Sequence, residues 1–230
     1  NYFKNINRQY LAGRKSIKVL YSMSSWTKLF GIDTLQDTLA TDLYIEYKRK
    51  DSLATRKSFL VLNRCVYDTD NGLYQYWSGQ RDSNFLATLK IKPSDLKESL
   101  IAVLNRTLDY RKKNTYSLDK IRRVKEEIVK QGMSDKPDNY FWQEEIKLLI
   151  DEDKKEDYFS LSEKMLTDNK FEPIDCNYFM ITYLSMFPKG KPLKKIKTWI
   201  DELEKNVKTE DDKLVIKNLR SSYDFYDNKD

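Results

Sequence analysis

The chain has 230 residues, of which 40% are hydrophobic and 34% are charged, and its formal net charge is +6. This balance predicts a globular protein with a sizeable core and a heavily charged surface, and it excludes a disordered chain. The sequence contains no histidine and only two cysteines. Serine–histidine and cysteine–histidine catalytic pairs, imidazole zinc sites and a disulfide framework are therefore excluded.

Cysteine usage and hydropathy predict a cytoplasmic location. Cys65 and Cys176 lie far apart in the sequence, and we expect both to be reduced thiols. The longest apolar stretch, Tyr178–Phe187, is much shorter than the ~20 apolar residues of a membrane span. No signal-peptide pattern opens the sequence. We therefore expect no membrane partner.

Charge is distributed unevenly along the chain. Residues 1–132 hold 25 Lys and Arg against 14 Asp and Glu, whereas residues 133–230 hold 17 against 22. The sign changes at the segment Gln131–Pro137, whose glycine and proline indicate a linker or a long turn. We therefore predict a basic portion over residues 1–132 and an acidic portion over residues 133–230.

The predicted fold is mainly α, because six glycines and five prolines leave few helix breakers. Apolar spacing predicts a bundle-like set of helices over residues 16–30, 53–68, 85–89 and 94–108, and another that opens at Ser117. Ser94 is the expected N-cap of the fourth. Residues 42–49 fit a short strand or a helix, and both alternatives stay open. Helical hairpins are predicted in the second portion, over residues 140–150, 158–166, 177–186, 193–207 and 211–226.

The most distinctive segment is the aromatic run Asn71–Gly79. Asn-Gly predicts a sharp turn, because glycine admits positive φ, and such a turn would return the following side chains to the preceding helix. Tyrosine and tryptophan offer large, rigid contact area, and glutamine offers a paired donor and acceptor. The predicted binding residues are Asn71, Gly72, Tyr74, Gln75, Tyr76 and Trp77. In the alternative interpretation, Leu73, Tyr76 and Trp77 are core, and Tyr74 and Gln75 are exposed spacers.

This run resembles a signature of a DNA-mimic protein family of small helical bacterial proteins. The match is carried by Asn71–Leu73 and Gln75–Trp77 and extends over residues 52–110, with Leu73 and Ser78 departing from the family pattern. The resemblance implies a helical module that binds a regulator or a toxin. Mimicry itself is not expected, since it needs carboxylates spaced like phosphates and this half of the chain is basic.

A magnesium-dependent nuclease is the alternative hypothesis. Asp33, Glu46 and Lys48 are spaced like an Asp…Glu-x-Lys core, in which the carboxylates hold the metal and the lysine steadies developing charge. Such a core needs a central sheet, of which the sequence offers at most one or two strands.

The preferred prediction is a non-enzymatic binding protein without metal or cofactor. A protein partner is favoured, and nucleic acid is the alternative partner through the basic half.

Overall fold

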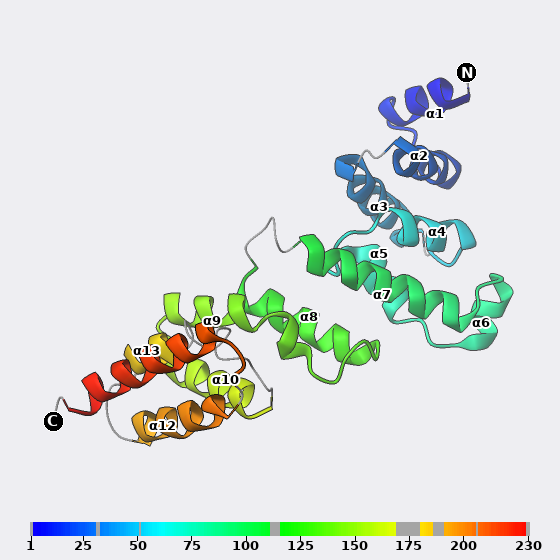
Figure 1. The fold of residues 1–230 in the computed structure, drawn as a ribbon. Helices are drawn as coiled ribbons and strands as arrows, with labels where there is room; N and C mark the ends of the chain where they lie inside the picture. Colours follow the sequence, from blue (N-terminus) through cyan, green and yellow to red (C-terminus); the bar gives the residue numbers. More distant parts are fainter. Residues whose placement is uncertain are drawn as a thin grey trace. The chain divides into compact units, whose positions relative to one another are not determined.

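The computed structural model describes residues 2–30, 33–50, 52–110, 116–168, 180–185, 191–205 and 207–228, without the side chains of residues 33, 34, 110, 166–168, 191 and 192. Within these ranges every regular element is a helix and no strand occurs (Figure 1). The prediction of a mainly α fold is therefore confirmed. The chain divides into two compact units, Asn1–Pro137 and Asp138–Asp230. The division falls at the end of the segment in which the charge balance changes sign.

The first unit is built from helices that pack mainly on their neighbours in the chain. The helices are α1 (Tyr2–Leu11), α2 (Ile17–Phe30), α3 (Asp33–Lys48), α4 (Arg56–Cys65), α5 (Gly72–Ser78), α6 (Ser83–Thr88), α7 (Pro93–Tyr110) and α8 (Leu118–Lys130). Helix α2 contacts α1, α3 and α4, helix α3 also contacts α5, and α7 contacts α4, α5 and α8. Such near-neighbour packing is typical of stacked helical scaffolds.

Short polar side chains begin several of these helices. The hydroxyl of Ser117 accepts from the backbone N–H of Lys120, so α8 begins where the sequence predicts. Gly132 follows α8 with φ +65°, a conformation that suits glycine at a helix C-terminus. Pro93 is already helical, so the prediction that Ser94 is the N-cap of α7 is wrong. The fixed φ of proline suits the first helical position, and the cap therefore lies before it.

Residues 42–48 belong to α3, so the helical alternative is right and the strand alternative is wrong. The buried positions explain why. Leu39, Ala40 and Leu43 are fully buried, whereas Ile45 is 48% exposed. The inward face therefore repeats every three to four residues, as in a helix, and the apparent alternation included one solvent-facing isoleucine.

The core of the first unit joins α2, α3, α4, α5 and α7. Its fully or almost fully buried side chains include Leu20, Met23, Leu39, Leu43, Leu62, Cys65, Leu73, Tyr74, Trp77, Leu100 and Val103. Burial raises the pKa of the Cys65 thiol to about 12. Cys65 therefore stays protonated near neutral pH and acts as a small apolar core residue.

The second unit contains α9 (Trp142–Asp151), α10 (Lys155–Asp168), a short helical stretch over residues 180–185, α12 (Lys191–Glu204) and α13 (Glu210–Asp227). A 3-10 helix, η2 (Pro137–Tyr140), leads into it. Helix α9 packs on α10, and α12 on α13. The ring of Tyr183 lies 6.0 Å from that of Tyr158 and 5.4 Å from that of Trp199, so aromatic side chains join these helices.

No helix among the described residues combines the length and the apolar character that crossing a membrane requires.

Candidate functional site

The aromatic run begins a helix and does not form the predicted turn. Asn71 caps α5 by accepting from the Leu73 N–H at 2.9 Å, and its side-chain nitrogen donates to Asp37 at 3.1 Å. Gly72 has no positive φ. A Cβ at this position would lie 2.3 Å from ring carbons of Tyr44. The glycine therefore permits the close approach of α5 to α3, and the turn prediction is wrong because the side chain of Asn71 starts a helix instead.

Two of the predicted contact rings are fully buried. The indole N–H of Trp77 donates to the hydroxyl of Ser58 at 3.0 Å, inside the core. The hydroxyl of Tyr74 donates to Glu127 at 2.9 Å. Burial first, and then the charge of Glu127, raises the pKa of Tyr74 well above its ordinary value. These hydrogen bonds connect α5 to α4 and to α8, so both rings stabilise the first unit.

Only two members of the run offer side-chain surface. Gln75 is exposed, and its amide donates to the carbonyl of Thr69 at 2.6 Å. Tyr76 is half-buried, and its ring is nearly perpendicular to that of Trp77. The alternative interpretation, in which Leu73 and Trp77 are core residues, is right for these two side chains. It is wrong for Tyr74, which was expected to be exposed and is buried in the core. Binding by this run stays a prediction for which Gln75 and Tyr76 supply the surface.

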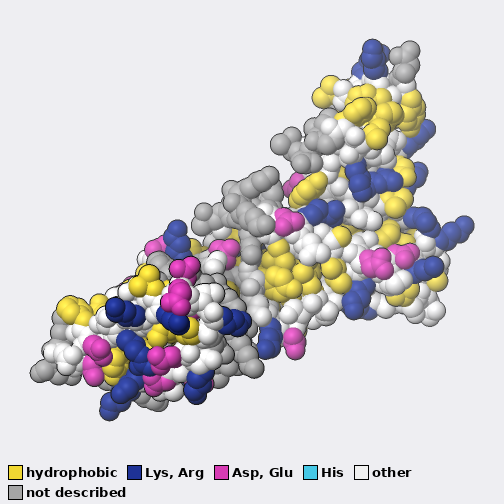
Figure 2. Space-filling view, viewed as in Figure 1, with side chains coloured by type: hydrophobic (Ala, Val, Ile, Leu, Met, Phe, Trp, Pro, Cys, Tyr) yellow, Lys and Arg dark blue, Asp and Glu magenta, His cyan; other side chains and the backbone are white. Residues whose placement is uncertain are grey.

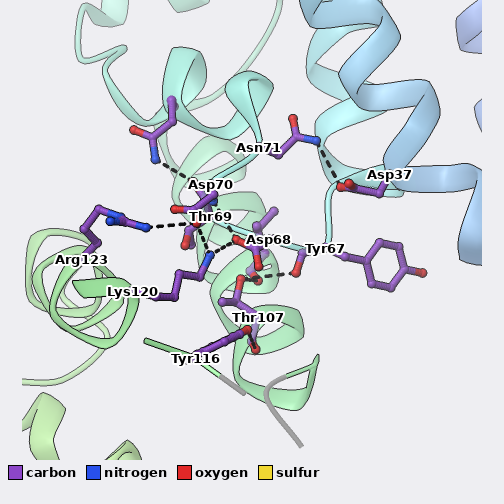
Figure 3. A network of polar contacts seen from close by, with 12 residues as sticks. Asp37, Tyr67, Asp68, Thr69, Asp70, Asn71, Thr107, Tyr116, Lys120 and Arg123 are labelled. Atoms are coloured by element: carbon purple, nitrogen blue, oxygen red, sulfur yellow. Dashed lines mark hydrogen bonds and ion pairs between the residues drawn. The ribbon is translucent and has the colours of Figure 1, made fainter. Parts of the chain in front are cut away.

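The loop that precedes α5 carries a network of ion pairs (Figure 3). Lys120 of α8 is 7% exposed, and its ammonium binds both Asp68 and Asp70, the latter at 2.7 Å. Arg123 reaches Asp70 at 3.2 Å. Burial alone would raise the pKa of Asp70, but the hydrogen bonds and charges of the two cations outweigh it and lower that pKa.

Hydrogen bonds between uncharged groups extend the same network to α7. The hydroxyl of Thr107 donates to the carbonyl of Tyr67 at 3.3 Å, and Tyr116 donates to the carbonyl of Thr107 at 2.8 Å (Figure 3). The arrangement therefore holds α7, α8 and the loop together. Among the described residues no three acidic or cysteine side chains are grouped so that they could hold a metal ion.

Two of the three nuclease residues are not brought together. Glu46 and Lys48 lie two positions apart on α3, and such positions point to different sides of a helix. Glu46 forms an ion pair with Lys50, which lowers the pKa of Glu46, and Lys48 lies over the ring of Tyr44 at 5.0 Å. The side chain of Asp33 lies outside the described residues. The strand context expected for these residues is wrong, because α3 continues through Lys48.

Sequence reasoning missed an aromatic surface on the first two helices. We define the α1–α2 aromatic surface by Tyr2, Phe3, Trp26, Leu29 and Phe30. The ring of Trp26 lies 5.1 Å from that of Phe3 and stacks on that of Phe30 at 5.6 Å. Tyr2 is nevertheless 53% exposed, Leu29 70% and Phe30 59%. Figure 2 shows hydrophobic side chains gathered over these two helices.

Two features of the sequence carry a signal for this surface. Trp26 and Phe30 are one helical turn apart on α2, with Leu29 beside them, so they fall on one face. Residues 1–32 contain six Lys and Arg and no Asp or Glu. Aromatic side chains in a segment without acidic residues are typical of a recognition surface. The count of charged residues over 1–132 does not show this local excess of positive charge, because it includes the acidic residues that follow.

Comparisons of the chain with family models, with curated proteins and with solved structures find no match.

Proposed function

We propose that this chain is a non-enzymatic protein-binding module that contacts its partner through the α1–α2 aromatic surface. One observation carries the proposal. The rings of Trp26 and Phe30 pack on each other, and yet the side chains of Phe30 and the neighbouring Leu29 are both more than half exposed. Clustered apolar side chains of this kind mark interaction sites, whereas single exposed ones do not. Aromatic anchors lose little conformational freedom on binding, so they supply much of the energy of an interface.

The scaffold supports the same proposal. Helices that pack on their chain neighbours present many side chains on their outer faces. The inward stripe of α1, which includes Ile6 at 2% exposed, packs on α2. Tyr2 and Phe30 stay more than half exposed beside this packed stripe. A regulator or a toxin, the partner class that the family resemblance implies, fits such a surface.

Nucleic-acid binding is a second candidate, favoured by the excess of positive charge in residues 1–132. A phosphate backbone is recognised mainly by Lys and Arg, so its binding falls steeply with salt and depends little on apolar side chains. The two candidates therefore differ in which substitutions abolish binding.

The test is a quantitative pull-down with the full chain, comparing wild type with the double variant Leu29→Ser/Phe30→Ser. A matched control is Leu214→Ser/Phe225→Ser, which removes two side chains of similar exposure, 57% and 58%, from α13. At least one captured protein should be lost roughly tenfold or more from the first variant, since two interface anchors are together worth more than about 1.4 kcal/mol. The control should retain it.

Equal capture by wild type and both variants would overturn the proposal. Capture that nuclease treatment and added salt remove would favour nucleic acid instead. Far-UV circular dichroism of both variants confirms that each remains folded.

A further inference from the structure

We infer that the first unit carries a second binding surface, which holds the phosphate backbone of a nucleic acid. We name it the basic edge and define it by residues 12–18, 47–57 and 89–92. It is separate from the α1–α2 aromatic surface. Lys18 and Phe30 are twelve residues apart on α2, which corresponds to about 18 Å along the helix axis. The inference therefore does not depend on the proposed function.

Hydrogen bonds place the three segments of the basic edge side by side. The backbone N–H of Ile17 donates to the hydroxyl of Tyr47, so the loop between α1 and α2 meets the end of α3. Residues 49–55 then connect α3 to α4. At the start of α4, Nη1 of Arg56 donates to the carbonyl of Lys90 at 2.6 Å, which brings in the loop between α6 and α7. The three segments therefore form one continuous edge.

Positive charge dominates this edge. The three segments hold ten Lys and Arg and one acid, Asp51, whose placement lies outside the described residues. All ten cations are exposed except Lys15, which is half-buried. Two acids of α3 also reach the edge, where Asp42 pairs with Lys15 at 2.6 Å and Glu46 pairs with Lys50. When these two acids are counted as well, positive charges exceed negative ones by seven.

Helix stability does not explain where several of these cations lie. Lys18 is in the first turn of α2, and Arg56 and Lys57 are the first two residues of α4. An acid in the first turn stabilises a helix through its dipole, whereas a cation opposes the dipole. Local stability would favour the cations at the end of α3 but not these three. Their placement instead favours a role for the charge in binding.

The surroundings of the cations indicate what they bind. Among the described residues of the three segments, no large apolar side chain is exposed. A protein interface needs apolar or aromatic anchors at its centre, and a bilayer takes up apolar side chains. Seven of the ten cations are Lys, which protein interfaces disfavour. A phosphate backbone needs only Lys and Arg, so it fits this edge best, and its recognition should not depend on base sequence.

The experiment measures binding of the full chain to a labelled duplex and a labelled single strand by fluorescence anisotropy. Both probes have mixed sequence and a length of about 20 nucleotides, which exceeds the ~4–16 nucleotides of typical single-strand sites. If about five of the cations contact phosphates, the affinity for the duplex should fall roughly 500-fold between ~50 mM and ~200 mM salt. Probes of different sequence should bind equally well.

Two variants test whether the basic edge is the site. Lys48→Glu/Arg49→Glu changes the end of α3, and Lys57→Glu/Lys92→Glu changes the start of α4 and the loop before α7. Each variant should weaken binding by about tenfold or more, and it should reduce the slope of log affinity against log salt by about two. Far-UV circular dichroism checks that each variant is folded. Edge variants that bind as tightly as wild type would overturn the inference.

A matched control separates the basic edge from net charge. Lys194→Glu/Lys197→Glu makes the same change of charge at exposed positions of α12, and it should weaken binding much less than either edge variant. Equal losses in all three variants would trace the affinity to net charge alone and overturn the inference. No binding by wild type at ~50 mM salt would also overturn it. So would binding of polyglutamate or phosphatidylserine vesicles in place of nucleic acid, since an acidic protein or a membrane would then be the partner. The pull-down decides the proposed function whichever result is obtained.

Discussion

Replacing Trp77 with alanine should cost the first unit about 3–5 kcal/mol of its free energy of unfolding. The side chain is fully buried between α4 and α5. An aromatic side chain buries about 150–250 Å², which at ~25 cal/mol per Å² corresponds to an upper limit of about 4–6 kcal/mol. Alanine retains the Cβ, and partial collapse of the cavity recovers part of the rest. The loss is a large share of the ~5–15 kcal/mol that stabilises a typical domain.

The hydrogen bond of the indole can be separated from its packing. Ser58→Ala leaves the ring in place but removes the acceptor of its N–H, which should cost about 1–3 kcal/mol because both groups are buried. Gln75→Ala is the matched control within the same helix, because Gln75 is exposed and its amide donates to the carbonyl of Thr69. It should cost no more than about 1 kcal/mol.

The assay is urea denaturation of the full chain followed by far-UV circular dichroism, with the transitions of the two units fitted separately. In Trp77→Ala only the transition of Asn1–Pro137 should move to lower urea, with its slope unchanged. If Trp77→Ala lost less than about 1 kcal/mol while abolishing partner binding, the ring would be a contact residue and the reasoning from its burial would be refuted.

Three further predictions follow from the same unit. Gly72→Ala should destabilise it by about 1–3 kcal/mol, because the new Cβ meets the ring of Tyr44, and Tyr44→Ala in the same chain should recover part of that loss in a double-mutant cycle. Lys120→Met should cost about 1–3 kcal/mol near neutral pH, discounted for the exposure of its partners. Because the folded pKa of Asp70 is lowered, its stabilising contribution is present above the unfolded pKa of about 3.9 and is lost as pH falls through the folded value. Unfolding curves at several pH values should therefore show wild type and Lys120→Met converging in acid, and a constant gap would contradict the ion pair. Finally, Cys65, in a chain whose other cysteine is replaced by serine, should resist thiol reagents until denaturant is added, whereas rapid labelling of the native chain would contradict its burial.

Local patterns predicted most of the helices. Ser117 followed by an apolar stripe predicted the start of α8, and the mixed segment over residues 16–30 was predicted to form the helix that is α2, since caps and periodicity act within a few residues. The failures involve contacts between distant segments. Nothing near Gly72 in sequence shows that Tyr44 will pack against it, and alternation around Ile45 imitates a strand because one apolar residue faces solvent.

The candidate site was harder to predict, because the sequence alone does not distinguish a buried aromatic side chain from an exposed one. The ring-rich run at Tyr74–Trp77 was the more conspicuous signal, yet Tyr74 and Trp77 are core residues. The more exposed rings, Tyr2 and Phe30, lie in helices whose composition is less unusual. Their distinguishing feature is local charge, visible only when residues 1–32 are counted by themselves.

Stability and recognition therefore depend on different aromatic side chains within one unit. Trp77 is enclosed by α4 and α5 and has no surface to offer, so a substitution there changes the population of the folded unit. Leu29 and Phe30 contribute little buried area to the fold, so substitutions there leave that population nearly unchanged and act on the partner. A loss of binding has different meanings at the two places. At Trp77 it should follow the loss of folded protein and be recovered by conditions that restabilise the unit. At Leu29 and Phe30 it should persist in fully folded protein, and that contrast assigns the contact to the α1–α2 aromatic surface.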